Sequence, residues 1–107
     1  MDRKKDKIII LLKQFKDKIS DEFKIKKMIF FGSRSKGRGR ETSDIDIILI
    51  SEDFKDKKSF ERSPHFYYMW DHPYDIDIIC LTPEELNKKK KQIGIIGQAL
   101  KEGIVIK

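Results

Sequence analysis

The feature that most constrains this chain is a pentapeptide, Asp-Ile-Asp-Ile-Ile, that occurs twice, at residues 44–48 and 75–79. In both copies, acidic and apolar residues alternate before the sequence becomes apolar, which is typical of a strand that enters a hydrophobic core. Residues i and i+2 of a strand point to the same face of the sheet. Each copy therefore predicts two aspartates on one face, at the start of a buried strand.

Helical spacing of apolar residues predicts a first helix over residues 6–23. A second helix is expected to begin at Thr82, because a capping threonine is followed by proline and then by acids in the first turn. We expect it to be interrupted near Gly94 and Gly97 and to resume as far as residue 101. A short helix is expected after Ser63-Pro64.

Strands are predicted over residues 27–31, 44–50, 75–81 and 104–106. Residues 34–43 contain no apolar side chain, so we expect a turn or a short exposed helical segment followed by a loop. The length of 107 residues suits one domain, residues 1–107. The order of elements predicts the α/β (α+β) class, with a small mixed sheet flanked by helices.

Gly32 and Ser33 follow the first predicted strand and precede Asp44 by ten residues. Glycine lets the backbone approach a phosphate closely, and a serine hydroxyl with the adjacent amides donates hydrogen bonds to phosphate oxygens. Four basic residues lie in the following loop: Arg34, Lys36, Arg38 and Arg40. One or two of them, with Arg34 preferred, are candidates for a further contact with phosphate, although a solvated loop is an equal alternative.

Asp44 and Asp46 are expected to converge on a metal ion, since two carboxylates on an otherwise apolar strand repel one another and lose hydration. Oxygen-only ligands favour Mg²⁺, or Mn²⁺, over zinc. Asp77 is the candidate for a third carboxylate, and Asp75 is the alternative on the same face. Aspartates at a strand end can also serve only solubility, but their combination with Gly32-Ser33 favours phosphoryl chemistry.

The net charge of +6 suggests a polyanionic ligand. Direct binding of nucleic acid is disfavoured, because no continuous basic patch with interleaved aromatic residues is found. No apolar run is long enough to span a membrane, and the single cysteine, Cys80, is expected to be a buried strand residue. We therefore expect a cytoplasmic protein, for which a homo-oligomer stays open.

From Gly32 to Asp46 the sequence resembles the minimal nucleotidyltransferases of the DNA polymerase β superfamily, whose hallmark is Gly-Ser, about ten residues and Asp-x-Asp. The resemblance extends over nearly the whole chain and implies the DNA polymerase β-like nucleotidyltransferase fold. It implies that Gly32 and Ser33 hold the triphosphate, and that Asp44, Asp46 and Asp77 are the catalytic metal ligands.

The resemblance also implies a biological role. Minimal nucleotidyltransferases are typically encoded beside a HEPN-domain ribonuclease toxin and act as its antitoxin. The expected reaction transfers AMP from ATP to a tyrosine of that toxin. Two alternatives are a non-catalytic module that neutralises its partner by contact, and a nucleotidyltransferase that acts on a small molecule or an RNA end.

The aromatic segment 66–70 has two interpretations, a core-packed short helix and a surface for adenine or a partner protein. His65 and His72 flank the segment without metal-ligand spacing, so both are expected to be surface or structural residues. The lysines at 88–91 are expected to form a solvated helix face.

Overall fold

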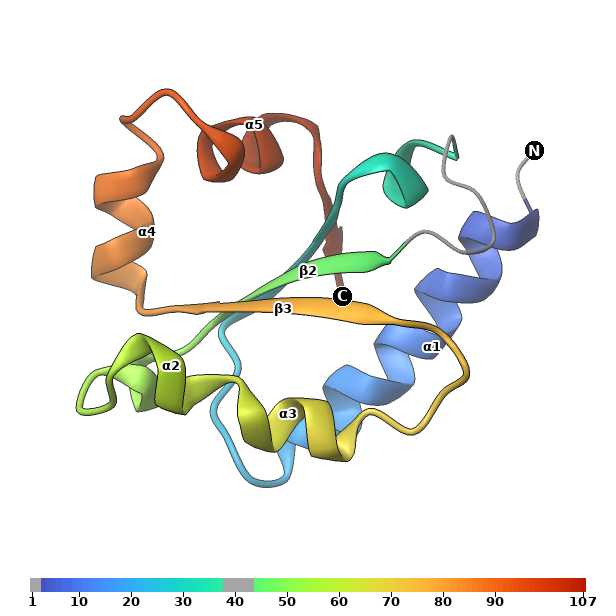
Figure 1. Ribbon diagram of the computed structural model, residues 1–107, viewed down its shortest axis with the longest axis horizontal. Coiled ribbons are helices and arrows are strands. Elements are labelled where there is room, and N and C mark those ends of the chain that lie inside the picture. Colours follow the sequence, from blue (N-terminus) through green and yellow to red (C-terminus); the bar gives the residue numbers. More distant parts are fainter. Residues whose placement is uncertain (1–2, 38–43) are drawn as a thin grey trace.

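The computed structural model describes residues 3–37 and 44–107. Its centre is a four-stranded sheet in the order β3-β2-β1-β4 (Figure 1). Strand β1 is antiparallel to both of its neighbours, β2 and β4, whereas β2 and β3 are parallel. The strands are β1 (Lys27–Phe31), β2 (Ile45–Ile50), β3 (Ile76–Leu81) and β4 (Ile104–Ile106).

Helices cover both faces of this mixed sheet, with α1 and α3 on one side and α5 on the other (Figure 1). None of the helices in the described ranges is long and apolar enough to cross a membrane. The helical segments are α1 (Arg3–Ser20), η1 (Ser33–Lys36), η2 (Glu52–Phe54), α2 (Ser59–Arg62), α3 (Pro64–Met69), α4 (Pro83–Lys89) and α5 (Ile95–Glu102).

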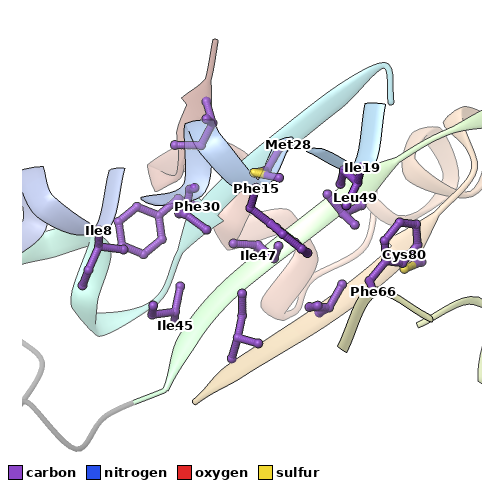
Figure 2. Close-up of a cluster of buried hydrophobic side chains, with 14 of the residues drawn as sticks. Ile8, Phe15, Ile19, Met28, Phe30, Ile45, Ile47, Leu49, Phe66 and Cys80 are labelled. Atoms are coloured by element: carbon purple, nitrogen blue, oxygen red, sulfur yellow. The ribbon is translucent and has the colours of Figure 1, made fainter. Parts of the chain in front are cut away.

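Alternation along β2 divides the core into two layers. Ile45, Ile47 and Leu49 point toward α1 and α3, and Figure 2 shows them among Phe15 and Phe66. The intervening residues point the other way, where Ile48 and Ile50 pack against residues of α4 and α5. Asp46 has the parity of the second set, so it belongs to the face that α4 and α5 share.

The four strands confirm the pattern predicted from the sequence, to within one residue at each end. The predicted helix 6–23 was too long at its C-terminal end, because α1 stops at Ser20. Phe23 instead closes a turn, donating its backbone N–H to the carbonyl of Ile19 at 2.9 Å. Its ring packs 4.8 Å from that of Phe66, so this side chain at helical spacing is partly buried against the core although the residue lies outside the helix.

The expected interruption after α4 is present, and it spans residues 90–94, with Gly94 directly before α5. Gly97 lies inside α5, where a Cβ atom would come within 2.8 Å of the Gln92 carbonyl oxygen. The second glycine therefore permits a close backbone contact and does not break the helix. Lys88 to Lys91 are exposed, as expected of a solvated face.

The aromatic segment divides between the two interpretations. Phe66 is fully buried, and the Trp70 ring packs edge-on against Phe15 at 5.1 Å. Tyr68 is 87% exposed, and the hydroxyl of Tyr67 accepts a hydrogen bond from the backbone N–H of Ile78 at 2.9 Å. The segment is therefore mainly structural, since it fills the core and covers the outer edge of β3.

The two histidines and the cysteine are surface or structural residues, as expected. His65 is exposed and lies 2.6 Å from a Glu22 carboxylate oxygen, and His72 packs against the Trp70 ring. Cys80 is buried as expected, and its burial raises the pKa of the thiol to about 12.

Replacing Thr82 by alanine is expected to lower the free energy of unfolding by about 1 kcal/mol. The Thr82 hydroxyl accepts from the Glu85 backbone N–H, and the Glu85 carboxylate accepts from the Thr82 N–H, so two donors at the start of α4 depend on this pair. Denaturant unfolding measures the loss. Ser63→Ala is the matched control, because Ser63 precedes α3 without a side-chain cap bond. Equal losses in both variants would contradict the prediction.

Candidate active site

Three chain segments meet at one end of the sheet. Because β1 runs antiparallel to β2, the last residue of β1, Phe31, lies opposite Asp46 near the start of β2. Because β2 and β3 are parallel and in register, Asp46 lies opposite Asp77. Gly32 and Ser33 follow Phe31 directly, so the sheet brings the Gly-Ser pair and the two aspartates together.

The aspartates lie on the face that carries α4 and α5, but beyond the part of it that these helices cover. Ile48 and Ile50 of β2 are fully buried, whereas Asp46 is half-buried and Asp77 is exposed. Asp44, which precedes β2, is exposed as well. The acidic end of this face is thus open to a ligand.

Gly32 is held against Asp46. Its φ of 81° lies in the region that residues other than glycine rarely adopt, and a Cβ atom there would collide with Oδ2 of Asp46. The absence of a side chain therefore allows the backbone after β1 to touch the carboxylate. This contact explains why the residue before Ser33 is glycine.

The three aspartates interact electrostatically. Burial raises the pKa of Asp46, and the negative charges of Asp77 and then of Asp44 raise it further. Of the two acids at β3, Asp77 is therefore the one whose charge raises the pKa of Asp46. Asp75 lies one step before β3, and its backbone carbonyl accepts from the Ile45 N–H at 2.8 Å.

Within residues 3–37 and 44–107, no three Asp, Glu, His or Cys side chains are already gathered closely enough to hold a metal ion. The arrangement nevertheless concentrates negative charge at one place. A bound cation would relieve the repulsion that raises the Asp46 pKa.

The structure corrects the expectation of an exposed segment after Ser33. Residues 33–36 form the short helix η1, but Arg34 is only 6% exposed and Ser35 is buried too. The Arg34 guanidinium lies 5.4 Å from the centroid of the Tyr74 ring, and the Ser35 hydroxyl donates to the Gly32 carbonyl at 2.7 Å. Both side chains thus support the loop. Arg38 and Arg40 lie outside the described residues.

A pocket of about 310 Å³ opens beside Gly32 and Ser33, between η1 and α5. Its lining combines apolar and polar residues, and apolar surface predominates. Its lining comprises Phe31, Gly32, Ser33, Ser35, Lys36, Ile95, Gln98, Ala99 and Glu102.

Sequence reasoning missed the contribution of α5 to this pocket. Gln98 and Glu102 stand one helical turn apart, and the Gln98 amide donates to the Glu102 carboxylate at 3.4 Å. In the sequence, a polar pair with this spacing cannot be distinguished from the solvent-exposed face of an amphipathic helix. Only the packing of α5 against β1 brings it near Ser33.

Comparison with known proteins agrees with this geometry. A family model described as a nucleotidyltransferase domain matches residues 12–74, which include Gly32, Ser33, Asp44 and Asp46. A crystal structure from Sulfolobus solfataricus, described as a candidate nucleotidyltransferase, covers 95% of this chain and 81% of its own, with a TM-score of 0.69 and 21% identity. At that identity the likeness concerns the fold.

No curated protein gives a significant match. Because the family match spans more than half of the chain, the protein belongs to the nucleotidyltransferase domain family.

Proposed function

We propose that this protein is a divalent-cation-dependent adenylyltransferase, which moves AMP from ATP to a hydroxyl group on a partner protein. The observation that carries the proposal is the pairing of Asp46 with Asp77 on one open face, directly beside Gly32 and Ser33. Transfer of a nucleotidyl group needs such a combination of carboxylates and phosphate donors, since catalysis rests on positioning and on charge neutralisation.

Gly32 and Ser33 are proposed to bind the triphosphate. Gly32 has no side chain of its own, and Ser33 is exposed. The Ser33 hydroxyl makes no hydrogen bond with the part of the chain that the structure describes. The Ser33 hydroxyl can therefore donate to a phosphate oxygen without breaking a bond to the described residues.

Asp44, Asp46 and Asp77 are proposed to hold Mg²⁺, or Mn²⁺. The residues fit such an ion in ligand type, because all three offer carboxylate oxygens, and in charge, because their repulsion raises the pKa of Asp46. When bound, the cation supplies neutralisation of the charge on the reacting phosphate.

Asp77 is proposed to orient the acceptor and to take its proton. Its side chain is exposed, so an incoming hydroxyl can reach the carboxylate. The hydroxyl oxygen forms a bond to the α-phosphorus, the bond between that phosphorus and the bridging oxygen breaks, and pyrophosphate leaves. The proton of the hydroxyl passes to Asp77.

The choice of ATP, and of a tyrosine on a HEPN-domain ribonuclease toxin as acceptor, is supported by the resemblance to minimal nucleotidyltransferases. The partner would then be silenced by covalent modification. Silencing by contact alone is the competing hypothesis, and the two differ in whether AMP is transferred.

Transfer of label from α-labelled ATP to a purified HEPN-domain partner, in the presence of Mg²⁺, tests the proposal. Asp77→Asn is expected to lower the rate about 10²- to 10⁴-fold, because it removes the proposed proton acceptor. Asp75→Asn is the matched control, since it makes the same change two residues earlier on the same strand face.

We expect Asp75→Asn to keep most of the activity, because β3 places Asp77 and not Asp75 opposite Asp46. Equal losses in the two variants would contradict the assigned role of Asp77. Full silencing of the partner by Asp77→Asn without label transfer would instead support neutralisation by contact.

A further inference from the structure

An ion pair bridges the pocket beside Ser33. Nζ of Lys36, at the end of η1, lies 2.5 Å from Oε2 of Glu102, at the end of α5. Lys36 and Glu102 have side chains that are 35% and 46% exposed, and the Gln98 amide donates to the same carboxylate oxygen. The positive charge nearest to Ser33 on this pocket wall is therefore already engaged by an acid of the same chain.

The Lys36–Glu102 ion pair lies beyond Gly32, on the side of Gly32 away from the aspartates. Strand order places Asp77 on β3, Asp46 on β2 and Gly32 after β1, and the pocket lined by Lys36 and Glu102 begins at Gly32. A nucleotide whose α-phosphate lies at the aspartates and whose next phosphate lies on Ser33 would direct its terminal phosphate toward Lys36. This placement rests on the proposed function.

We propose that Glu102 is an internal competitor of the nucleotide polyphosphate for Lys36. In the free protein Glu102 holds the ammonium group, and on binding the terminal phosphates take it over. The exchange is favourable because an exposed ion pair contributes little net stability, whereas a polyphosphate carries several charges to the carboxylate's one. Glu102 is thus a positioning residue that lowers affinity for ATP and for the pyrophosphate product.

The competition has a mechanistic consequence for product release. Pyrophosphate keeps the two phosphates that would contact Ser33 and Lys36, so it must leave these groups before the next cycle. A carboxylate that recaptures Lys36 favours this departure. Glu102 therefore weakens the binding of ATP and pyrophosphate, and it favours release of the product before the next cycle.

Calorimetric binding of pyrophosphate, ATP and AMP in the presence of Mg²⁺ tests the proposal with four variants. These are Glu102→Gln, Lys36→Met, the double variant, and Glu84→Gln. Glu84→Gln is the matched control, because it changes the net charge equally and breaks only an exposed pair on α4, with Lys88 at 3.9 Å. Unfolding midpoints close to that of the wild type show that each variant is folded.

Glu102→Gln is expected to bind pyrophosphate and ATP about two- to fivefold more tightly than the wild type, the range of an exposed ion pair. Lys36→Met is expected to weaken both about tenfold or more, since it removes a charged hydrogen-bond donor. In the Lys36→Met background, Glu102→Gln should give no further gain. AMP binding should respond to neither change, because AMP lacks the distal phosphates.

The role of Glu102 would be overturned if Glu84→Gln and Glu102→Gln raised the affinity for pyrophosphate and ATP equally. It would also be overturned if Glu102→Gln still raised this affinity in the Lys36→Met background. In either case wild-type binding of ATP would leave the proposed function standing. If the wild type bound neither ATP nor pyrophosphate with Mg²⁺, both proposals would fail together. Steady-state kinetics add a separate readout, since Glu102→Gln should lower KM for ATP without raising kcat.

Discussion

Replacing Asp46 by asparagine is expected to lower nucleotidyl transfer by about 10²-fold or more, while the folded protein becomes as stable as the wild type or more stable at neutral pH. The loss of activity follows from the position of Asp46 between Gly32 and Asp77, where its charge is proposed to hold the cation. The gain in stability follows from the same position. Burial and two neighbouring carboxylates make the ionised form of Asp46 unfavourable in the folded state.

The direction of the pH dependence follows from the raised pKa. Above the ordinary value of 3.8, the folded protein binds the Asp46 proton more tightly than the unfolded chain does. Its stability therefore falls as pH rises from 3.8 through the raised pKa of Asp46, and then levels off. The asparagine variant lacks this dependence, so its advantage should be full at neutral pH and should shrink toward about pH 4.

Thermal unfolding in a chelating buffer, followed from about pH 4 to pH 8, measures this difference. Adding Mg²⁺ should then raise the unfolding midpoint of the wild type more than that of Asp46→Asn, since a ligand stabilises the state that binds it. An active Asp46→Asn variant, or one that is less stable than the wild type in chelator, would contradict the assignment of Asp46.

Replacing Gly32 by alanine is expected to cost about 1–3 kcal/mol of stability and also to impair catalysis strongly. The stability cost comes from φ of 81°, which an alanine adopts only under strain. The effect on transfer comes from the new Cβ atom, which would collide with Asp46 Oδ2 and displace either the loop or the carboxylate. A small displacement at a phosphate site has a large effect on rate, so we expect a loss of about 10²-fold.

Gly37→Ala separates the two effects, because Gly37 closes η1 with a φ of 71° and shares the backbone cost. Both alanine variants should therefore lose stability in denaturant unfolding, whereas Gly32→Ala should lose far more activity under conditions in which both are folded. Similar losses of transfer in the two variants would mean that the contact between Gly32 and Asp46 is unimportant.

The sequence was sufficient for the features that depend on near neighbours. Alternation at residues 44–48 and 75–79 predicted two strands that each begin with acids, and both form. The order Thr82-Pro83 with acids behind it predicted the start of α4, where the capping box is observed. Periodicity was less reliable at Phe23, because that side chain reaches the core from a turn.

For the site, the sequence by itself predicted the proposed donor set: Gly32-Ser33 and aspartates that share a strand face. Alternation and turn chemistry act within a few residues, so they can be read from the chain alone. Only the tertiary structure decided that Asp77 lies opposite Asp46, that Arg34 is buried beside Tyr74, and that α5 brings Glu102 to Lys36. The reason is physical: strand register and helix packing are set by contacts between segments far apart along the chain, and no local pattern encodes which segments meet.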